Sequence, residues 1–100
     1  MSNEAAIEAE IQAKGLTAPR LTPSDIDAAI KGAEYAVFSG VLTVCVLTLQ
    51  NGFMIVGESA CANPENFNAE LGAKIARDNA RAKIWAFEGY ALRNKLAATA

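Results

Sequence analysis

The dipeptide Asn51-Gly52 separates two apolar stretches rich in β-branched residues, residues 41–50 and 53–60. Asn-Gly between such stretches is the strongest short-range signal for a β-hairpin with a two-residue turn, because both turn residues then take positive φ values. Another strand is expected at residues 34–38, so the middle of the chain is expected to form a small antiparallel sheet. Both faces of the hairpin are largely apolar, and we expect something to cover each of them.

A two-residue turn fixes which residues of the hairpin face each other, and it places Cys45 opposite Glu58. Glu58 would then lie on an otherwise apolar face. A partly desolvated carboxylate in that position could accept hydrogen bonds from a ligand. The alternative is a residue at the sheet edge, or a structural ion pair with Arg77 or Arg81.

Signals for helices flank this hairpin on both sides. Residues 3–14 have amphipathic spacing and are followed by Gly15, which predicts one short helix. Thr22-Pro23 combines an N-cap with proline at the first helical position, which predicts a second short helix. Residues 69–97 contain no strong helix breaker, so they predict a helix about 40 Å long. A domain of this size has a radius of gyration of about 13 Å, so this helix should extend beyond its own domain.

The long helix carries two apolar stripes. One comprises Leu71, Ile75, Ala82, Trp85, Leu92 and Leu96, and the other comprises Ala73, Ala76, Ala80, Ile84, Phe87 and Ala91. Two apolar faces need two surfaces to pack against. We expect one stripe to cover the sheet and the other to contact a second subunit, in a homodimer or a higher homo-oligomer.

These elements together predict an α+β fold that is dimeric, with a small antiparallel β-sheet, two short N-terminal helices and one long C-terminal helix. A chain of 100 residues fits one compact unit. We expect residues 1–20 to form an N-terminal helix and connector, and residues 21–100 to form a single α+β ligand-binding domain. The chain has no signal-peptide pattern and no stretch near the roughly 18 apolar residues of a membrane span, so we expect a cytoplasmic protein without a membrane partner.

Charge and side-chain composition exclude several classes of function. The net charge is −2 and the sequence pI is near 5.0, whereas binding of a DNA or RNA polymer needs a basic surface. Histidine is absent, which removes the commonest general base and the commonest metal ligand. Cys45 and Cys61 are too few for a zinc site, and their opposite parity along the hairpin predicts two unbridged thiols. We therefore expect no enzyme, no metal and no cofactor, with Glu58 and an activated water as the one catalytic alternative.

Two further groups of side chains are candidates for ligand binding. Arg77 and Arg81 are four residues apart on one helix face, with Lys83 close by, and like charges so placed repel unless an anion such as a phosphate joins them. The alternative is a solvated face with salt bridges. Phe53 and Phe67 could stack on a nucleobase, although aromatic residues of this kind more often belong to the core.

Several motifs resemble a family of small phage-encoded proteins. They are Leu42-Thr43-Val44-Cys45-Val46-Leu47-Thr48-Leu49 with Asn51-Gly52-Phe53, then Gly57-Glu58-Ser59-Ala60-Cys61 with Pro64, Asn66 and Phe67, and in the long helix Ile75-Ala76-Arg77, Asn79-Ala80-Arg81, Lys83-Ile84-Trp85 and Glu88-Gly89-Tyr90. The likeness extends from Leu21 to about Leu96. The family looks like the group that includes the first-described Thoeris anti-defence proteins, which are sponges that sequester the cyclic ADP-ribose signal made by TIR-domain immune enzymes.

The resemblance implies that the protein binds a small nucleotide-derived immune signal in the host bacterial cytosol without turning it over. In this role Phe53 would stack on the base, and Arg77 and Arg81 would hold the phosphates. Glu58 and Asn63 would take hydrogen bonds of the ribose or base. The chain departs from the family pattern at Asn63, where we expect Asp.

Further departures are found at Asn68, Ala82 and Ala86-Phe87, and the N-terminal helix is short. The resemblance therefore gives no support for capture of larger cyclic oligonucleotides. The alternative function is that of a phage accessory protein that inhibits a host protein by direct binding, through the second apolar stripe of the long helix.

Overall fold

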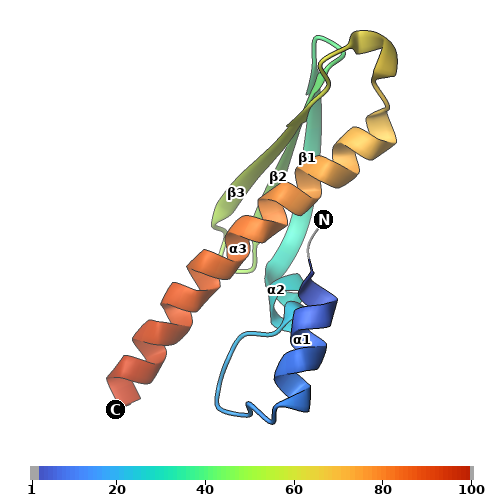
Figure 1. The fold of residues 1–100 in the computed structure, drawn as a ribbon. Helices are drawn as coiled ribbons and strands as arrows, with labels where there is room; N and C mark the ends of the chain where they lie inside the picture. The colour runs from blue at the N-terminus through green and yellow to red at the C-terminus, as the bar shows by residue number, and fades with distance from the viewer. Residues whose placement is uncertain (1–2, 100) are drawn as a thin grey trace.

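A long helix, α3, lies across one face of a three-stranded antiparallel sheet and continues well beyond it (Figure 1). The computed structural model describes residues 3–99. In chain order the elements are α1 (Glu4–Ala13), α2 (Pro23–Ala29), β1 (Ile30–Phe38), β2 (Leu42–Leu49), β3 (Met54–Ala60), the 3-10 turn η1 (Pro64–Asn66) and α3 (Ala69–Thr99). The predicted α+β class, the antiparallel sheet and the long C-terminal helix are confirmed.

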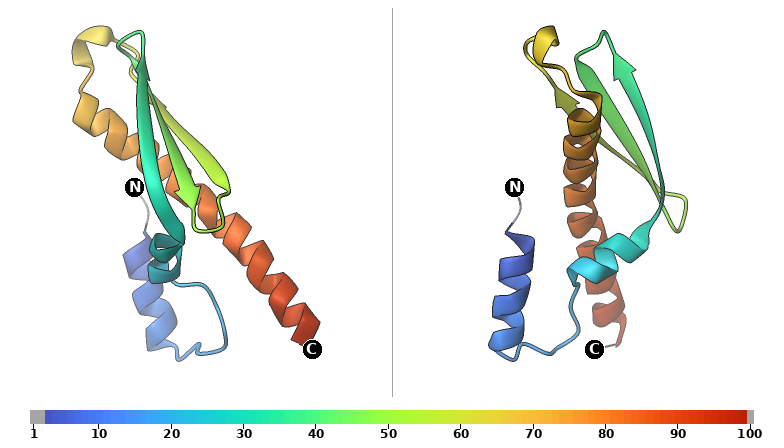
Figure 2. Two further views of the ribbon diagram at one scale, coloured as in Figure 1. Left: turned by 180° about the vertical axis from the view of Figure 1, so that it is seen from behind. Right: turned by 90° about the vertical axis from the view of Figure 1, so that its right-hand side faces the viewer.

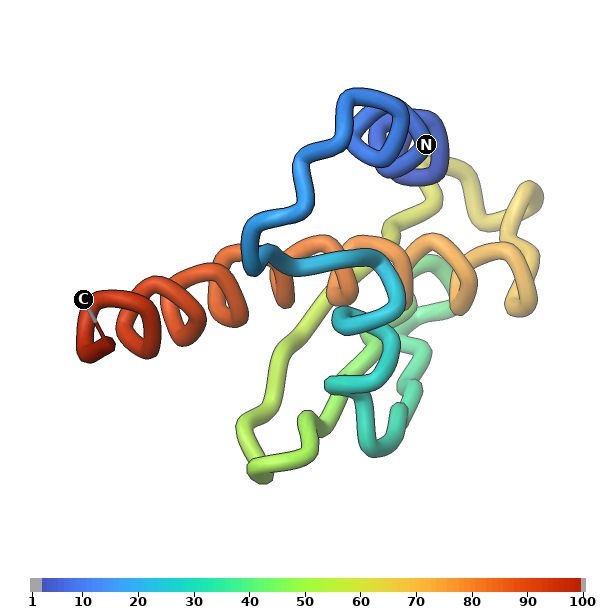
Figure 3. Tube along the Cα trace, turned by 90° about the horizontal axis from the view of Figure 1, so that it is seen from below, coloured from blue at the N-terminus to red at the C-terminus, as the bar shows by residue number. Residues whose placement is uncertain are grey.

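The elements form layers. The strands lie in the order β1-β2-β3, and α3 packs on the inner face of β2 and β3. Helix α1 lies on the side of α3 that points away from the sheet, and α2 connects α1 to the start of β1 (Figures 2 and 3). The principal extents of 53 × 31 × 17 Å reflect the part of α3 that projects past the sheet.

The turn of the β2–β3 hairpin has three residues and not the predicted two. The backbone N–H of Gly52 donates to the carbonyl of Leu49 at 2.9 Å, and the N–H of Leu49 donates to the carbonyl of Phe53 at 2.8 Å. Gly52 is in the left-handed region, with a φ of 89°. Asn51 uses its side chain, whose Oδ1 accepts a hydrogen bond from the Phe53 N–H at 3.0 Å. Because asparagine can close a turn through its side chain as well as through a left-handed backbone, the dipeptide alone did not determine the turn length.

The longer turn moves every side chain of β3 to the opposite face, because strand side chains alternate. Cys45 pairs with Gly57, and Glu58 pairs with Val44. The predicted pairing of Cys45 with Glu58 is therefore wrong. Glu58 lies exposed on the outer face of the sheet, away from α3, and not in an apolar pocket.

The core lies between α3 and the inner face of the sheet. Its buried members are Ile26, Cys45, Leu47, Leu49, Ile55, Ala76, Ala80 and Ile84. The α3 stripe that contains Ala76, Ala80 and Ile84 thus covers the sheet, as expected. In the other stripe Trp85 is half-buried, whereas Leu71 and Ile75 are exposed, and its contact with a second subunit stays a prediction.

Helix α3 makes its closest approach to the sheet at Gly57. A Cβ atom at this position would overlap the backbone nitrogen of Ala80 and the backbone oxygen of Ala76, and it would lie 2.7 Å from the Cα of Ala80. Small residues on both elements therefore allow the two backbones to touch.

Two polar side chains of α3 bind the free edge of β3. The amide nitrogen of Asn79 donates to the carbonyl of Glu58 at 2.8 Å, and the ammonium of Lys83 donates to the carbonyl of Val56 at 2.6 Å. Unpaired edge carbonyls can recruit a strand from another molecule. These bonds protect the β3 edge and anchor the middle of α3.

Local signals place the starts of α2 and α3 as predicted, whereas α2 ends at Ala29 and not at the predicted Gly32, which lies in β1. Thr22 and Asp25 form a capping box, in which each side chain accepts a hydrogen bond from the backbone N–H of the other, at 3.2 and 2.9 Å. The side chain of Asn68 caps α3 by accepting from the N–H of Leu71 at 2.9 Å. By contrast, β1 begins at Ile30 rather than at residue 34, because pairing with β2 extends further than its composition indicates.

Cys45 and Cys61 are free thiols, as predicted, but for a different reason. The N–H of Cys61 donates to the carbonyl of Val41, so Cys61 lies opposite the start of the β2 strand. Four residues along a strand separate Val41 from Cys45, a distance of roughly 13 Å. Distance and not parity keeps the two sulfurs apart.

The outer face of the sheet is apolar and open. Phe38, Met54 and Val56 are 53%, 54% and 41% exposed. Within residues 3–99, no helix packs over this face (Figure 2). In the same range, no helix has the length and apolar character that crossing a membrane requires.

Candidate functional site

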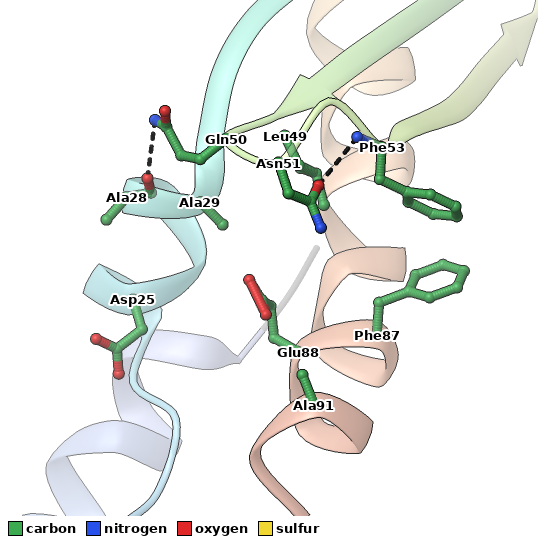
Figure 4. Close-up of a pocket in the computed structure, with 10 residues that line it drawn as sticks. All are labelled: Asp25, Ala28, Ala29, Leu49, Gln50, Asn51, Phe53, Phe87, Glu88 and Ala91. Atoms are coloured by element: carbon green, nitrogen blue, oxygen red, sulfur yellow. Dashed lines mark hydrogen bonds between the residues drawn. The ribbon is translucent and has the colours of Figure 1, made fainter. Parts of the chain in front are cut away.

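An open cleft of about 600 Å³ lies between the β2–β3 turn, α2 and the C-terminal half of α3 (Figure 4). Phe53 and Phe87 form one wall of the cleft, with ring centroids 5.0 Å apart and planes inclined by 59°. Phe53 follows the turn directly, so the shape of the turn aims its ring at α3. Phe53 remains 47% exposed and Phe87 49% exposed, which leaves both rings accessible to a ligand.

The polar groups of the cleft are amides and carboxylates. Asn51 and Gln50 come from the turn, Glu88 from α3 and Asp25 from α2. Glu88 points toward Asn51 across the cleft (Figure 4). Among the described residues that line it, the cleft has no lysine or arginine. It therefore suits a flat ring with hydrogen-bond donors better than a phosphate group.

Arg81 lies at the junction of all three helices. Its Nε donates to Oδ1 of Asp27 at 2.7 Å, and its two terminal nitrogens donate to the two carboxylate oxygens of Glu4 at 2.7 and 3.0 Å. The indole nitrogen of Trp85 donates to the same Glu4 carboxylate at 3.1 Å. The hydrogen bonds from Arg81 are the main reason why the pKa of Glu4 lies below its usual value, and burial opposes that shift.

Arg77 lies one helical turn before Arg81 and faces β1. It is close to the phenol of Tyr35 and the thiol of Cys45, the two groups that face each other across the β1–β2 ladder. Burial raises the pKa of both groups, and the charge of Arg77 acts against that rise. Arg77 and Arg81 therefore share a side of α3 but have different neighbours: Arg77 lies beside β1, whereas Arg81 binds carboxylates of α1 and α2.

The other two predicted residues lie elsewhere. Glu58 is on the outer sheet face, and Asn63 caps η1 by accepting a hydrogen bond from the N–H of Glu65 at 3.0 Å. Phe53 precedes β3 and Asn63 follows it, and a seven-residue strand is roughly 20 Å long. One protomer thus does not bring the five predicted residues together, and their role in ligand binding stays a prediction.

Sequence reasoning did not select Phe87, Trp85 or Glu4 as site residues. Phe87 belongs to the stripe that packs on the sheet, and the spacing of that stripe predicts a core residue. Its ring is accessible because it meets the sheet at Phe53, next to the hairpin turn. Glu4 meets Arg81 across 77 residues of sequence. No local spacing signals a contact of that range, so only the tertiary structure reveals it.

Comparison with known proteins gives one result. The model of the phage protein (N4 Gp49/phage Sf6 gene 66) family matches residues 21–96. This range includes the sheet, the aromatic cleft and both arginines, and it leaves out α1. No curated protein and no solved structure matches the chain.

Proposed function

The chain belongs to the phage protein (N4 Gp49/phage Sf6 gene 66) family, and on that premise we propose that it is an anti-defence protein. It binds a cyclic ADP-ribose-type nucleotide signal of host immunity and holds it without turning it over. The motifs by which the chain resembles this family all lie within the matched range, residues 21–96, and the family looks like the group that includes the Thoeris anti-defence sponges.

The observation that carries this proposal is the aromatic wall of the 600 Å³ cleft. Two rings at 5.0 Å, both about half exposed, offer a stacking surface for an adenine ring. The side-chain amides of Asn51 and Gln50 and the carboxylates of Glu88 and Asp25 can pair with the donors of a base and of ribose hydroxyls.

The phosphates of the ligand need cations that this cleft does not provide. Arg77 and Arg81 are the proposed phosphate ligands, with Glu58 and Asn63 as further polar contacts. Since these residues are distributed over both ends of one protomer, we propose that a second copy completes the site. The surfaces available for such a homo-oligomer are the second α3 stripe with its exposed Leu71 and Ile75, the open outer sheet face, and the projecting end of α3.

Sequestration fits the chemistry of the chain better than turnover does. A sponge needs burial and hydrogen bonds but no general base, and the sequence contains no histidine. Tight binding that holds the signal in its intact form would lower its free concentration by mass action alone.

The test is to incubate the protein with cyclic ADP-ribose isomers, remove free ligand, denature the protein and analyse what is released. We expect intact ligand to be recovered. Recovery of a cleaved product would show an enzyme, and recovery of nothing would refute the proposal.

A pair of matched variants tests the cleft itself. Loss of a stacked base costs about 1–3 kcal/mol, so Phe53→Ala should weaken binding about 5- to 150-fold. Leu16→Ala is the control, because Leu16 is 56% exposed in the connector between α1 and α2 and lies outside the cleft and outside the surfaces proposed for the homo-oligomer. Equal loss of affinity in both variants would contradict the assignment of the cleft, even if the ligand is bound.

The alternative is that the protein inhibits a host protein by direct binding. The predicted surface for it is the second apolar stripe of α3, where Leu71 and Ile75 are exposed, and the open outer sheet face is a further apolar surface. The exposed side chains of Phe38, Met54 and Val56 favour this candidate. A charge at their centre distinguishes the two. Val56→Asp should weaken nucleotide binding if this face completes the nucleotide site of a homo-oligomer, whereas under the alternative the wild type itself should not retain cyclic ADP-ribose.

A further inference from the structure

Helix α1 is attached to the rest of the protein mainly by polar contacts. It has no fully buried residue. Cavities of about 750 and 270 Å³ lie along its boundary, and Glu4 and Trp85 line both of them. A helix packed this loosely gains little from apolar burial, so its charged contacts decide whether it stays in place.

Two carboxylates of α1 make those contacts. Glu4 accepts two hydrogen bonds from Arg81 and one from the indole of Trp85. Glu8 accepts two from Arg20, at 2.7 and 2.8 Å. The side chains of Arg81 and Glu4 are only 16% and 23% exposed, so their pair is partly shielded from solvent.

Arg81 does not depend on α1 for its orientation. Its Nε is bound by Asp27, and one terminal nitrogen also donates to the carbonyl of Pro23 at 3.3 Å. Both partners belong to α2. If α1 moves away, α2 still holds the guanidinium, and its terminal N–H groups and the Trp85 indole N–H become free for another oxyanion.

Three donors that converge on one carboxylate also match the geometry of a phosphate group, because arginine binds both anions through two parallel N–H groups. We propose that α1 is a displaceable plug, in which the Glu4 carboxylate occupies a phosphate-binding site formed by Arg81 and Trp85. The inference rests on the proposed function for the identity of its ligand, and it adds Trp85 as a binding residue and α1 as the element that controls access.

The plug makes binding competitive. Ligand phosphate must displace Glu4, so the measured dissociation constant equals the intrinsic constant divided by the fraction of molecules in which α1 is open. If α1 is closed in about nine molecules of ten, its release strengthens binding about 10-fold. Asp27 stays beside Arg81 and limits the net positive charge of the site. Free phosphate should therefore bind less tightly than a ligand whose other groups have contacts elsewhere on the protein.

The experiment uses the full chain and the fluorescence of Trp85, its single tryptophan. Wild type, Glu4→Gln and Glu10→Gln are titrated with inorganic pyrophosphate and, separately, with cyclic ADP-ribose isomers. Glu10→Gln is the matched control, because it removes the same charge from α1 at an exposed pair with Lys14. We expect Glu4→Gln to bind pyrophosphate about 10-fold more tightly than wild type, and Glu10→Gln to bind it as wild type does.

A second measurement covers the case in which Glu4→Gln alters the fold. Saturating pyrophosphate should speed amide hydrogen exchange of residues 7–13 in wild type, because α1 is released. Equal or weaker binding by Glu4→Gln, or unchanged exchange of α1 at saturation, would overturn the plug. The pyrophosphate titration does not involve the immune signal, so the two proposals can fail separately. If α1 responds to pyrophosphate but cyclic ADP-ribose does not bind, the proposed function is refuted and the plug is not.

Discussion

Replacement of Gly57 by alanine is expected to destabilise the protein through one defined clash. The added Cβ would overlap backbone atoms of Ala76 and Ala80, and backbone atoms cannot rotate away as the end of a flexible side chain can. Helix α3 must therefore move back from the sheet along the stretch where Ala76, Ala80 and Ile84 form the core. Overpacking of this kind costs about 1–3 kcal/mol.

The assay is thermal unfolding at matched protein concentration. For a domain of this length, each kcal/mol lowers the melting temperature by roughly 4–8 °C, so a decrease of about 4–24 °C is expected. Gly32→Ala is the control, because a Cβ at Gly32 meets nothing within 4 Å. That variant should match or slightly exceed the wild type in stability, since alanine restricts the unfolded chain.

A double variant separates the backbone clash from side-chain crowding. Ala80→Gly removes only a methyl group, and the atoms that Gly57→Ala would overlap include the backbone of residue 80 itself. Adding Ala80→Gly should therefore give no rescue. Equal melting temperatures for Gly57→Ala and Gly32→Ala, or full rescue by Ala80→Gly, would refute the close approach of α3 at this point.

Three further predictions concern the ion pairs and thiols. Arg81→Ala should lower the free energy of unfolding by about 1.5–3 kcal/mol in chemical denaturation, because it removes charge-assisted hydrogen bonds to Glu4 and Asp27. Acid should release α1. Hydrogen bonds from Arg20 and Gln12 lower the pKa of Glu8 from 4.5 to about 2. The contact therefore stabilises the protein fully above pH 4.5 and is lost as the pH falls toward 2, and Trp85 fluorescence measures this loss. Cys61 should react with an alkylating reagent in the native state and Cys45 only after unfolding, because Cys45 is fully buried and burial raises its pKa. Mass spectrometry of the adducts measures both reactions.

Local sequence signals predicted the helices well, because each signal acts within one turn of the chain. Thr22 and Pro23 determine the start of α2, and Asn68 caps α3. Between Ala69 and Thr99 no residue interrupts the hydrogen-bonded helix, so its length followed from the sequence. The stripe that packs on the sheet was predictable for the same reason, since its spacing is that of a helix.

The hairpin register was not predictable from the same kind of signal. Two- and three-residue turns are both compatible with Asn51-Gly52, and the choice depends on whether the Asn51 side chain binds the Phe53 N–H. A single residue of difference then reverses the faces of a whole strand. Long-range pairs were equally unpredictable, because the contact of Arg81 with Glu4 joins residues 77 positions apart and no sequence pattern connects them.

The corrected register changes what Glu58 can do. It now lies on the open outer face with Met54 and Val56, and in a single protomer it cannot reach a ligand held against Phe53. A binding role for Glu58 therefore requires a second molecule that covers this face. In that case Glu58→Gln should weaken ligand binding and the association of protomers together, whereas Phe53→Ala should weaken ligand binding alone. Light scattering beside a binding titration on both variants measures the two effects, and weaker nucleotide binding by Glu58→Gln in a persistent monomer would contradict the argument.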